Sequence, residues 1–242
     1  MALKHIVIYT CITGGYDELL EPMVVEPRVD YICVSDGAPR QGSVWRHLPL
    51  PLNMGDAAAN SRYVKMHPHI LFPQYDISIY VDGNIQLLAP ITDLASEAME
   101  HASIALYQHS FRNCVYEEAR ECSAIGHDWH WRIIAQMSRY RRDGFPTSWG
   151  LFEGNVIIRS NGNPDMANLM EMWWNEYLSG VRRDQLSLTY LAWKSSTKIY
   201  NLGPSDPRDM RAYFSLHKIH SGHLLLTKFR GILNRRILLL GL

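Results

Sequence analysis

The sequence predicts an α/β protein in which helices flank a sheet, and three features support this fold class. Short apolar, β-branched runs alternate with longer stretches of helical period. No internal repeat, low-complexity tract or flexible linker interrupts the alternation. The chain has 242 residues, 47% of them hydrophobic, which is enough for one large domain with a sizeable core. We therefore expect a single α/β domain over residues 1–205 and a basic, partly helical tail over residues 206–242.

The expected strands and helices follow from the period of the apolar residues and from the turn residues between them. The expected strands are residues 5–12, 31–34, 77–81, 103–107 and 155–159. The expected helices are residues 56–66, 91–101, 166–178 and 184–194, with two further helical stretches on either side of Gly126. Asp56 is a suitable N-cap for the first of these helices. Pro204 and Pro207 indicate where the compact domain ends.

Charge is balanced over the chain but not along it. Lys plus Arg and Asp plus Glu both number 24, so the net charge is zero, which argues against non-specific binding of nucleic acid. After Asp209 the chain has no acidic residue. It does have several basic ones: Arg211, Lys218, Lys228, Arg230, Arg235 and Arg236. This tail fits either an anionic membrane surface or a helix docked on the domain.

The cysteines and the N-terminus indicate the compartment. The four cysteines lack the paired spacing of zinc ligands: Cys11, Cys33, Cys114 and Cys122. Reduced thiols of this kind are typical of cytosolic proteins. The apolar run after Lys4 and His5 is too short for a signal peptide or a membrane span. We expect a cytoplasmic protein, with contact to the inner face of the membrane if the tail binds lipid.

Polar residues directly after a predicted strand are the first candidates for a site, because ligands of open α/β sheets bind beyond the carboxyl ends of the strands. The apolar strand of residues 77–81 leads into Asp82, Gly83 and Asn84. Two oxygen ligands one residue apart can share Mg²⁺ or Mn²⁺, and a glycine between them permits close approach of a ligand. Asp-Gly-Asn is also ordinary β-turn chemistry, so both interpretations stay open.

Three further places combine charge with a strand end or a helix start. Asp36 follows the second strand, where a carboxylate commonly meets a ribose hydroxyl, although a cap or an Asx-turn is an equal alternative. Arg62, Lys65 and His69 are spaced for one helix face, which could bind a diphosphate or be merely solvated. Asp184 could serve simply as the N-cap of the following helix.

The tail offers His217, His220 and His223 at spacings of three residues, and any of them could be a third metal ligand. Other chemistry has no template in the chain. It contains no Gly-x-Ser-x-Gly nucleophile elbow, no phosphate-binding loop and no His-Glu-x-x-His sequence.

The order of these segments resembles the glycosyltransferase-like family that includes the plant seed-mucilage proteins and many bacterial members. The resemblance spans about residues 5–200 of the chain. The segments that carry it are residues 9–17, Arg62 and Lys65 ahead of Pro68-His69, Asp82-Gly83-Asn84, residues 114–119, Glu153-Gly154-Asn155, Trp173-Trp174 and Arg183-Asp184-Gln185.

This resemblance implies a GT-A-like (Rossmann-like) mixed sheet and a glycosyltransferase that moves a sugar from a nucleotide-sugar donor to a glycan or glycolipid acceptor. The implied metal is Mn²⁺ or Mg²⁺, held by Asp82, Asn84 and His220, with His223 as the second choice. The implied donor-binding residues are Thr10, Cys11, Ile12, Tyr16, Asp17, Asp36, Arg62, Lys65, Asp82, Gly83, Asn84, Gly154, Asn155 and Arg183. The implied catalytic residues are Glu153, Asp184 and Gln185.

The stereochemistry and two rival functions stay open at this stage. Asp184-Gln185 is similar to the Asp-Gln element of glycogenin-like retaining transferases, and His220-Ser221-Gly222 is similar to their late His-x-x-Gly metal-ligand segment. An inverting enzyme would instead use Glu153 or Asp184 as the base. Those relatives usually have Asp-x-Asp where this chain has Asn84, which leaves a non-catalytic sugar-nucleotide binder as an alternative. A metal-dependent hydrolase of a nucleotide sugar or phosphodiester is the other.

Overall fold

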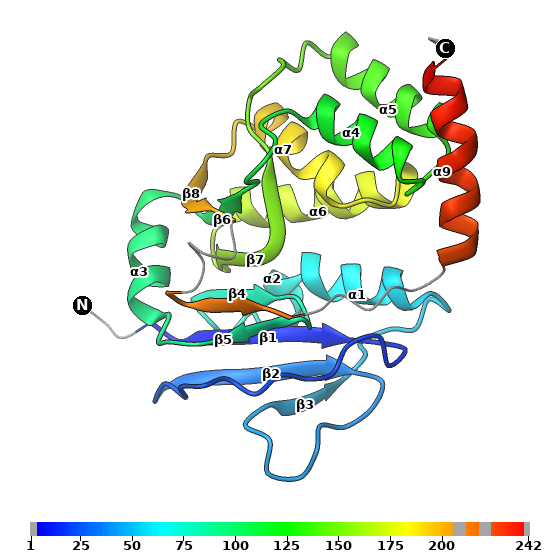
Figure 1. Ribbon diagram of the computed structural model, residues 1–242. Coiled ribbons are helices and arrows are strands. Elements are labelled where there is room, and N and C mark those ends of the chain that lie inside the picture. Colours follow the sequence, from blue (N-terminus) through cyan, green and yellow to red (C-terminus); the bar gives the residue numbers. More distant parts are fainter. Residues whose placement is uncertain (1–3, 206–211, 218–223, 240–242) are drawn as a thin grey trace.

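The computed structural model describes residues 4–205, 212–217 and 224–239. Figure 1 shows a main sheet whose strands are stacked from β3 at the bottom to β6 and β8 above, with helices on both faces. The strands of the main sheet are β1 (Ile6–Ile12), β2 (Val29–Ser35), β3 (Arg46–Pro49), β4 (Ile77–Val81), β6 (Ile104–Gln108), β7 (Phe152–Ser160) and β8 (Ile199–Pro204). Their order is β3-β2-β1-β4-β7-β6-β8, and β5 (Ile85–Leu87) pairs separately with β9 (Phe214–Leu216).

The described helices fall on two sides of the main sheet. They are α1 (Ala57–Met66), α2 (Pro68–Leu71), α3 (Thr92–His101), α4 (Val115–Ala124), α5 (His130–Arg142), α6 (Pro164–Ser179), α7 (Gln185–Lys194) and α9 (Leu224–Leu239). Apolar residues of α1, α4, α5, α6 and α7 share one core with one face of the sheet. Residues of α3, β5 and β9 share a second core with the other face.

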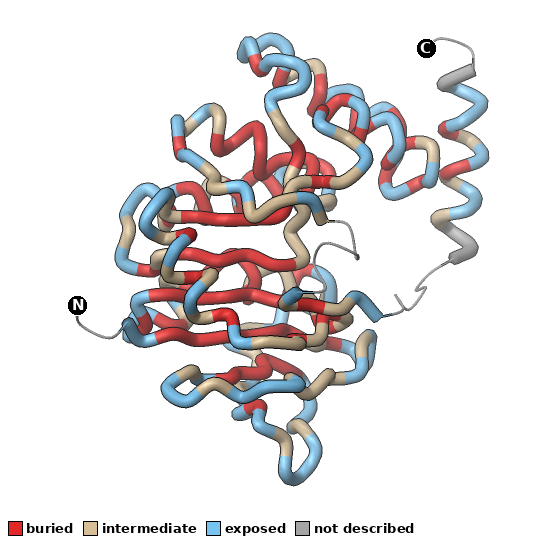
Figure 2. The backbone as a smooth tube through the Cα atoms, turned by 60° about the vertical axis from the view of Figure 1, so that its left-hand side comes forward, coloured by how far each residue is buried: buried red, intermediate tan, exposed pale blue. Residues whose placement is uncertain are grey.

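The alternation of side chains along β1 and β4 explains why these strands are apolar throughout. Val7 and Tyr9 point into the first core, whereas Ile6 and Ile8 point into the second. All five residues of β4 are buried, and Figure 2 shows this burial along the central strands. A strand that is covered on both faces has apolar residues at every position. This is why the continuous apolar runs of the sequence predict these strands.

Strand direction determines which chain segments meet at the site. β1, β2 and β3 are parallel to one another, and β1 is parallel to β4. β7 is antiparallel to both neighbours, β4 and β6. The carboxyl ends of β1, β2, β4 and β6 therefore meet at the same sheet edge as the amino end of β7.

A buried arginine joins the sheet to the end of α1. Arg159, on β7, is fully buried, and its Nη1 donates a hydrogen bond of 2.6 Å to the carbonyl oxygen of Lys65. Its Nη2 donates to the hydroxyl of Tyr9 on β1. Burial lowers the pKa of Arg159. The guanidinium thus satisfies the carbonyl at the end of α1 and fixes the position of that helix on the sheet.

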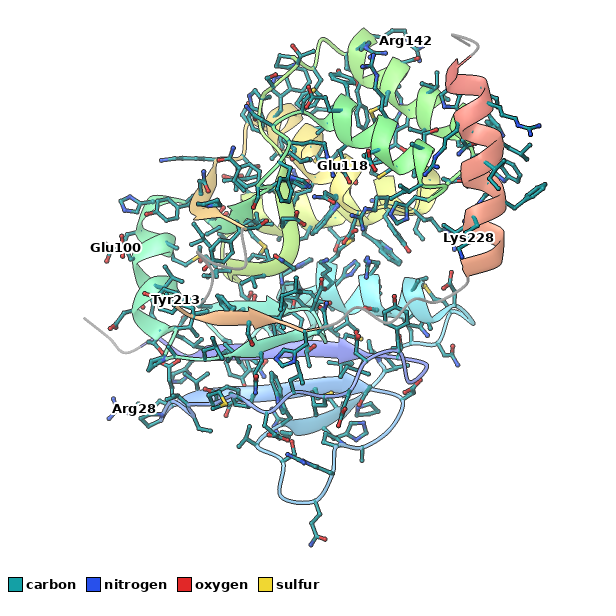
Figure 3. All side chains as sticks on the ribbon, viewed as in Figure 1. Arg28, Glu100, Glu118, Arg142, Tyr213 and Lys228 are labelled. Carbon is teal, nitrogen blue, oxygen red and sulfur yellow. The ribbon has the colours of Figure 1, made fainter. Side chains whose placement is uncertain are left out.

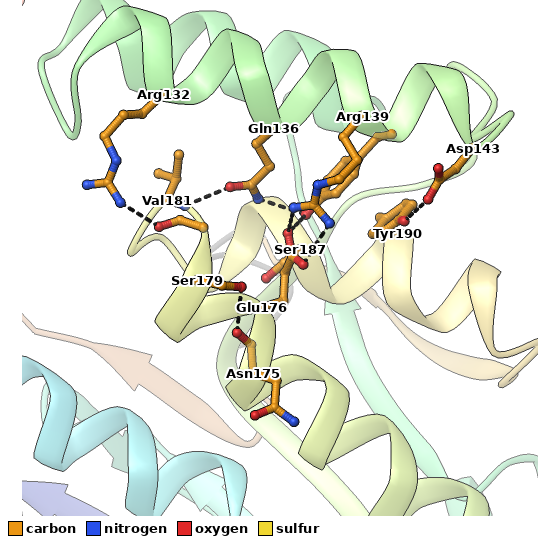
Figure 4. Close-up of polar contacts among 12 residues, drawn as sticks. Arg132, Gln136, Arg139, Asp143, Asn175, Glu176, Ser179, Val181, Ser187 and Tyr190 are labelled. Carbon is orange, nitrogen blue, oxygen red and sulfur yellow. Dashed lines mark hydrogen bonds and ion pairs between the residues drawn. The ribbon is translucent and has the colours of Figure 1, made fainter.

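Helix α5 is held on α6 and the loop after it by the contacts drawn in Figure 4. Arg139 Nη1 donates to Glu176 at 3.0 Å, and the hydroxyl of Tyr140 donates to the same carboxylate at 2.8 Å. The side-chain oxygen of Gln136 accepts from the backbone N–H of Val181 at 2.6 Å. These bonds fix the loop that leads to Asp184.

Helix α9 packs on α4 and on the loop that follows it. Asn234 is buried, and its amide donates 2.9 Å hydrogen bonds to the carbonyl oxygens of Ser123 and Asp128. Gly126 has φ +80°, and a Cβ there would meet the backbone of Thr227 and Gly231. Two glycines thus permit close contact between the loop and the helix. The docked helix is one of the two arrangements expected of the tail.

The α/β class is confirmed, and the strand order agrees with the predicted GT-A-like mixed sheet flanked by helices. Asp56 caps α1 as predicted, accepting from the N–H groups of Ala58 and Ala59. The short strands β3, β5, β8 and β9 were not predicted. The shared face predicted for Arg62, Lys65 and His69 is wrong for His69, because α1 ends at Met66 and the His69 ring contacts Glu171.

Two predictions of organisation stay predictions. Described parts of the segment after residue 205 contact the domain through β9 and α9, while the boundary itself stays a prediction. Among the described residues, no helix combines the length and the apolar character that crossing a membrane requires. The cytoplasmic location stays a prediction as well.

The close approach at Gly126 gives a prediction about stability. Gly126→Ala should lower the Tm more than Gly144→Ala. Both glycines have positive φ (+80° and +84°), so each alanine costs about 1–2 kcal/mol in backbone strain. A Cβ at Gly144 meets nothing within 4 Å, whereas one at Gly126 adds overpacking of about 1–3 kcal/mol. Trypsin should also cleave α9 sooner in Gly126→Ala. Equal Tm values and equal cleavage rates would contradict this docking.

Candidate active site

The tip of β4 places Asp82 at the edge where the strands end. The backbone N–H of Asp82 donates to the carbonyl oxygen of Asn155 at 2.9 Å, and its own carbonyl accepts from Ile85 at 2.9 Å. These two bonds fix the Asp82–Asn84 turn against the amino end of β7. The side chain of Asp82 is 33% exposed, so a ligand can reach its carboxylate.

Gly83 allows a second acidic residue to lie against this turn. A Cβ at position 83 would lie 2.8 Å from Oδ2 and 3.0 Å from Cβ of Asp17. No side chain larger than glycine fits there unless Asp17 moves. The turn therefore has Asp17 on one side and Asp82 within it, and both residues belong to the predicted donor-binding set.

A buried ionic cluster lies behind Asp82 and joins three distant segments. Lys65, 2% exposed, has its Nζ 2.7 Å from Oδ2 of Asp184 and 3.7 Å from Oδ1 of Asp82. The Nε of Arg62 lies 3.1 Å from the same Oδ2 of Asp184. Gly154 makes room for the ammonium group, because a Cβ there would lie 2.9 Å from Nζ. The solvated face considered for Arg62 and Lys65 is therefore wrong for Lys65.

The cations of this cluster keep Asp184 ionised. Burial by itself would raise the pKa of Asp184, but Arg62, Lys65 and Arg183 outweigh burial and hold the pKa well below its ordinary value. The negative charge of Asp184 also raises the pKa of Arg62. A carboxylate held in this way is a poor proton acceptor, so Asp184 is suited to orienting cations.

The backbone of Asp184 is anchored in the first core. Nε1 of Trp173 donates to the carbonyl oxygen of Asp184 at 2.9 Å. Trp173 is fully buried and Trp174 is 9% exposed, so both residues pack in the first core. Asp184 occupies the N-cap position of α7, but its side chain makes no capping hydrogen bond and contacts Lys65 instead.

A pocket of about 540 Å³ lies beside the ends of β1 and β2. Its lining includes Ile12, Asp17, Cys33, Asp36, Arg40 and Gln86. The Asp36 carboxylate accepts from the N–H of Gly14 at 2.6 Å, which orders the loop at the mouth of the pocket. Space of this size, with apolar and carboxylate groups together, suits a nucleoside.

The predicted residues of β1 and of the loop after it divide between the pocket and the core. Ile12 and Asp17 line the pocket, and Tyr16 is 49% exposed beside it. Thr10 and Cys11 are buried, at 2% and 5% exposure, and neither lines the pocket. Burial raises the pKa of Cys11 to about 12, so its thiol stays neutral.

Glu153 forms a second acidic position next to Gly154. Its carboxylate lies 3.5 Å from Nε2 of His109, which follows β6. Nδ1 of His109 accepts the backbone N–H groups of Phe111 and Arg112, each at 3.1 Å, and this assigns the ring proton to Nε2. The Nε2 atom lies 3.3 Å from Nη2 of Arg112 as well, and the side chain of Glu153 is 26% exposed.

Glu118, labelled in Figure 3, is the buried anion behind His109. It accepts from Nε of Arg112 at 2.7 Å and lies 3.7 Å from Nη2 of Arg183. Arg183 also donates to Oε1 of Gln185 at 2.7 Å. Among the described residues, Nε2 of Gln185 and Nε of Arg183 are buried without a hydrogen-bond partner, which fits a polar ligand at this place.

His109, Arg112 and Glu118 were not assigned roles from the sequence. Glu118 lies within the segment 114–119 that carries the family resemblance, and His109 directly follows a strand at the same sheet edge. The rule that identified Asp82 could therefore have identified His109. The contact of Glu118 with Arg183 joins residues far apart in the chain, and no local pattern indicates it.

The predicted metal ligands are only partly described. The carbonyl oxygen of Asn84 accepts from the N–H of His217 at 2.8 Å, and the His217 ring lies 3.1 Å from Oε1 of Gln86. His220 and His223 lie outside the described residues. Within the described ranges, no three His, Cys, Asp or Glu side chains are grouped so as to bind a metal ion. Asn155 bonds through its side-chain oxygen to the N–H of Val156.

The fold is a mixed α/β sheet with charged residues gathered at one edge. Sequence comparison identifies the family. The chain belongs to the TOD1/MUCI70 glycosyltransferase-like domain family, which matches residues 39–203. This match confirms the family predicted from the sequence. A relative is the probable hexosyltransferase MUCI70 of Arabidopsis thaliana, 26% identical over 175 residues. The match covers 67% of this chain but 30% of the relative, so the chain spans less than a third of that protein.

Two solved glycosyltransferases are remotely similar. Mouse xyloside xylosyltransferase 1, in its apo form, aligns with a TM-score of 0.49 at 12% identity, covering 81% of this chain and 84% of that one. The galactosyltransferase LgtC, in complex with donor and acceptor sugar analogs, aligns with a TM-score of 0.46 at 12% identity, covering 81% and 72%.

The ionic cluster gives a prediction about stability. Asp184→Asn should destabilise the protein by about 3–5 kcal/mol, because it leaves the buried Lys65 without its closest counter-charge. Arg182→Ala, which removes an exposed ion pair with Asp56, should cost at most about 1 kcal/mol. Urea unfolding at neutral pH measures both. Equal losses would contradict the central position of the cluster.

Proposed function

We propose that this domain transfers a sugar from a nucleotide-diphosphate sugar to a hydroxyl group of a glycan or glycolipid acceptor. One observation carries the proposal: at a single sheet edge, a pocket of nucleoside size adjoins the accessible Asp82 carboxylate and the cations Arg62 and Lys65. The pocket suits the nucleoside of such a donor, and the carboxylate and cations beside it suit the diphosphate.

The three parts of the donor lie one after another along this sheet edge. The nucleoside occupies the pocket beside β1 and β2, with Asp36 near the ribose hydroxyls. The diphosphate lies at the Asp82–Asn84 turn, where Gly83 permits close approach and Arg62 offers a positive charge. The sugar then points toward Gly154, Glu153 and the partly unpaired groups of Arg183 and Gln185.

A divalent cation, Mn²⁺ or Mg²⁺, belongs to this proposal. The partly exposed carboxylate of Asp82 and the uncharged side chain of Asn84 fit a hard cation, and Asp17 against Gly83 adds a carboxylate to the same turn. Asp82 and Asn84, with His220, are the residues assigned to hold it. When bound, the cation would neutralise the negative charge that develops on the departing nucleotide diphosphate.

Lys65 and Arg62 act on the same developing charge. Lys65 Nζ lies between the carboxylates of Asp184 and Asp82. Asp184, at 2.7 Å, holds the ammonium group, and Asp82 lies 3.7 Å from it. Arg62 is fixed by Asp184 in the same way. Cations held in place before the reaction stabilise the leaving group without reorganisation at the moment of transfer.

Retention of anomeric configuration is the favoured stereochemistry, because both candidate bases, Glu153 and Asp184, already lie against other groups. Asp184 is bound by cations, and the Glu153 carboxylate lies 3.5 Å from Nε2 of His109. In the proposed step the acceptor oxygen bonds to the anomeric carbon while the bond from that carbon to phosphate breaks. The electron pair and the acceptor proton leave with the nucleotide diphosphate, and Glu153 orients the acceptor hydroxyl.

Donor binding tests the site without an acceptor. A panel of nucleotide sugars with Mn²⁺ should include one that raises the Tm by about 5–10 °C, since saturation at a hundredfold over Kd adds about 2.7 kcal/mol. Asp82→Ala should lose the shift, and Asp165→Ala, an exposed carboxylate on α6, should keep it. A shift that persists in Asp82→Ala would refute the metal and diphosphate assignment. Acceptor-independent cleavage to a sugar phosphate would favour the hydrolase instead.

Glu153→Gln separates a positioning role from a base. The amide still accepts a hydrogen bond, so the rate should fall about tenfold, with the donor-induced Tm shift unchanged. Loss of a general base would cost about 10²–10⁴-fold instead. NMR of the product measures the anomeric configuration, which should match that of the donor. An inverted product together with the larger loss would make Glu153 the base.

A further inference from the structure

The outward face of α9 is a mixed apolar and cationic surface that the proposed reaction does not use. It comprises Lys228, Phe229, Ile232 and Arg236, which are exposed and share one side of the helix by their spacing. Phe229 is 57% and Ile232 is 56% exposed. Figure 3 labels Lys228 on this helix, at the right-hand edge of the view.

The opposite face of α9 is fixed to the domain, so the outward face is displayed in one orientation. Gly231 packs on the loop after α4, and Asn234 bonds to Ser123 and Asp128. This loop adds two further exposed apolar side chains beside the helix, Ile125 at 39% and Trp129 at 38% exposure.

The charge of this surface has one sign. Helix α9 contains Lys228, Arg230, Arg235 and Arg236 and no acidic residue. The whole chain has zero net charge, so the excess of basic residues on α9 is local.

We propose that the outward face of α9 docks the domain on an anionic lipid bilayer. Long Lys and Arg side chains can reach lipid phosphates while Phe229 and Ile232 enter the boundary between headgroups and acyl chains. Each cation near an anionic leaflet contributes about 1 kcal/mol. A face four residues wide with cations between apolar groups is narrow for a protein interface, which buries about 800 Å² on each partner.

If the proposed function holds, docking on a bilayer also determines which acceptors the donor site can reach. The N–H of His217 bonds to Asn84 at the β4 tip, and α9 begins at Leu224. Seven Cα–Cα steps separate His217 from Leu224, so the start of α9 lies within about 25 Å of His217. A sugar acceptor carried on a lipid in the same bilayer is therefore within reach of the donor.

Vesicle sedimentation of the whole protein tests the docking surface. The probes are vesicles of phosphatidylcholine alone and of phosphatidylcholine with phosphatidylglycerol. The wild type should bind the anionic vesicles and not the neutral ones, and 1 M NaCl should weaken the binding. Lys228→Glu with Arg236→Glu should reduce anionic binding at least tenfold. The matched control, Lys4→Glu with Lys198→Glu, reverses two exposed cations elsewhere and should bind as the wild type.

Three outcomes would overturn the proposal. These are no binding of the wild type to anionic vesicles, equal binding to both vesicle types, and unchanged binding of the double variant in α9. A dimer in light scattering that the α9 variant dissociates, without vesicle binding, would assign the face to a second copy instead. The donor-induced Tm shift should be the same in all three proteins, so its absence would count against the proposed function and not against the docking surface.

Discussion

The buried contact between Lys65 and Asp184 is the constraint on which the site depends. An ammonium group that is 2% exposed needs a counter-charge, and Asp184 supplies it at 2.7 Å. The contact joins α1 to the start of α7, and Asp82 at the tip of β4 lies on its accessible side. Both residues of this contact are also held through their backbones. The buried Arg159 donates to the carbonyl oxygen of Lys65, and the buried Trp173 donates to that of Asp184. The charged groups are thus rigid because the apolar core fixes their backbones.

The direction of β7 determines what else reaches this place. If β7 were parallel to β4, its amino end would lie at the opposite edge of the sheet. Being antiparallel, it pairs Val156 with Val81 and brings Glu153 and Gly154 to Asp82. β6 ends at the same edge and adds His109 beside Glu153. The segments assigned to donor and acceptor therefore meet at one point, although they are far apart in the chain.

Much of the fold follows from local sequence, and less of the site does. The apolar runs of β1 and β4 and the cap at Asp56 are local signals, so they were predicted. β3 and β9 are short and lack an apolar run, and they become strands only through their partners. Asp82 was found because it follows a buried strand. The partner of Lys65 lies 119 residues away, so neither the burial of Lys65 nor the role of Asp184 is visible in the sequence.

The central claim is that the diphosphate of a nucleotide sugar binds at the Asp82 turn, with the nucleoside in the pocket of β1 and β2. Anomalous scattering from a crystal soaked with Mn²⁺ and a nucleotide diphosphate tests it most directly. The account predicts a manganese peak within about 2.3 Å of an Asp82 oxygen, bridged to the phosphates, as oxygen ligands require. A nucleotide bound elsewhere, or bound in the pocket with manganese remote from Asp82, would contradict it.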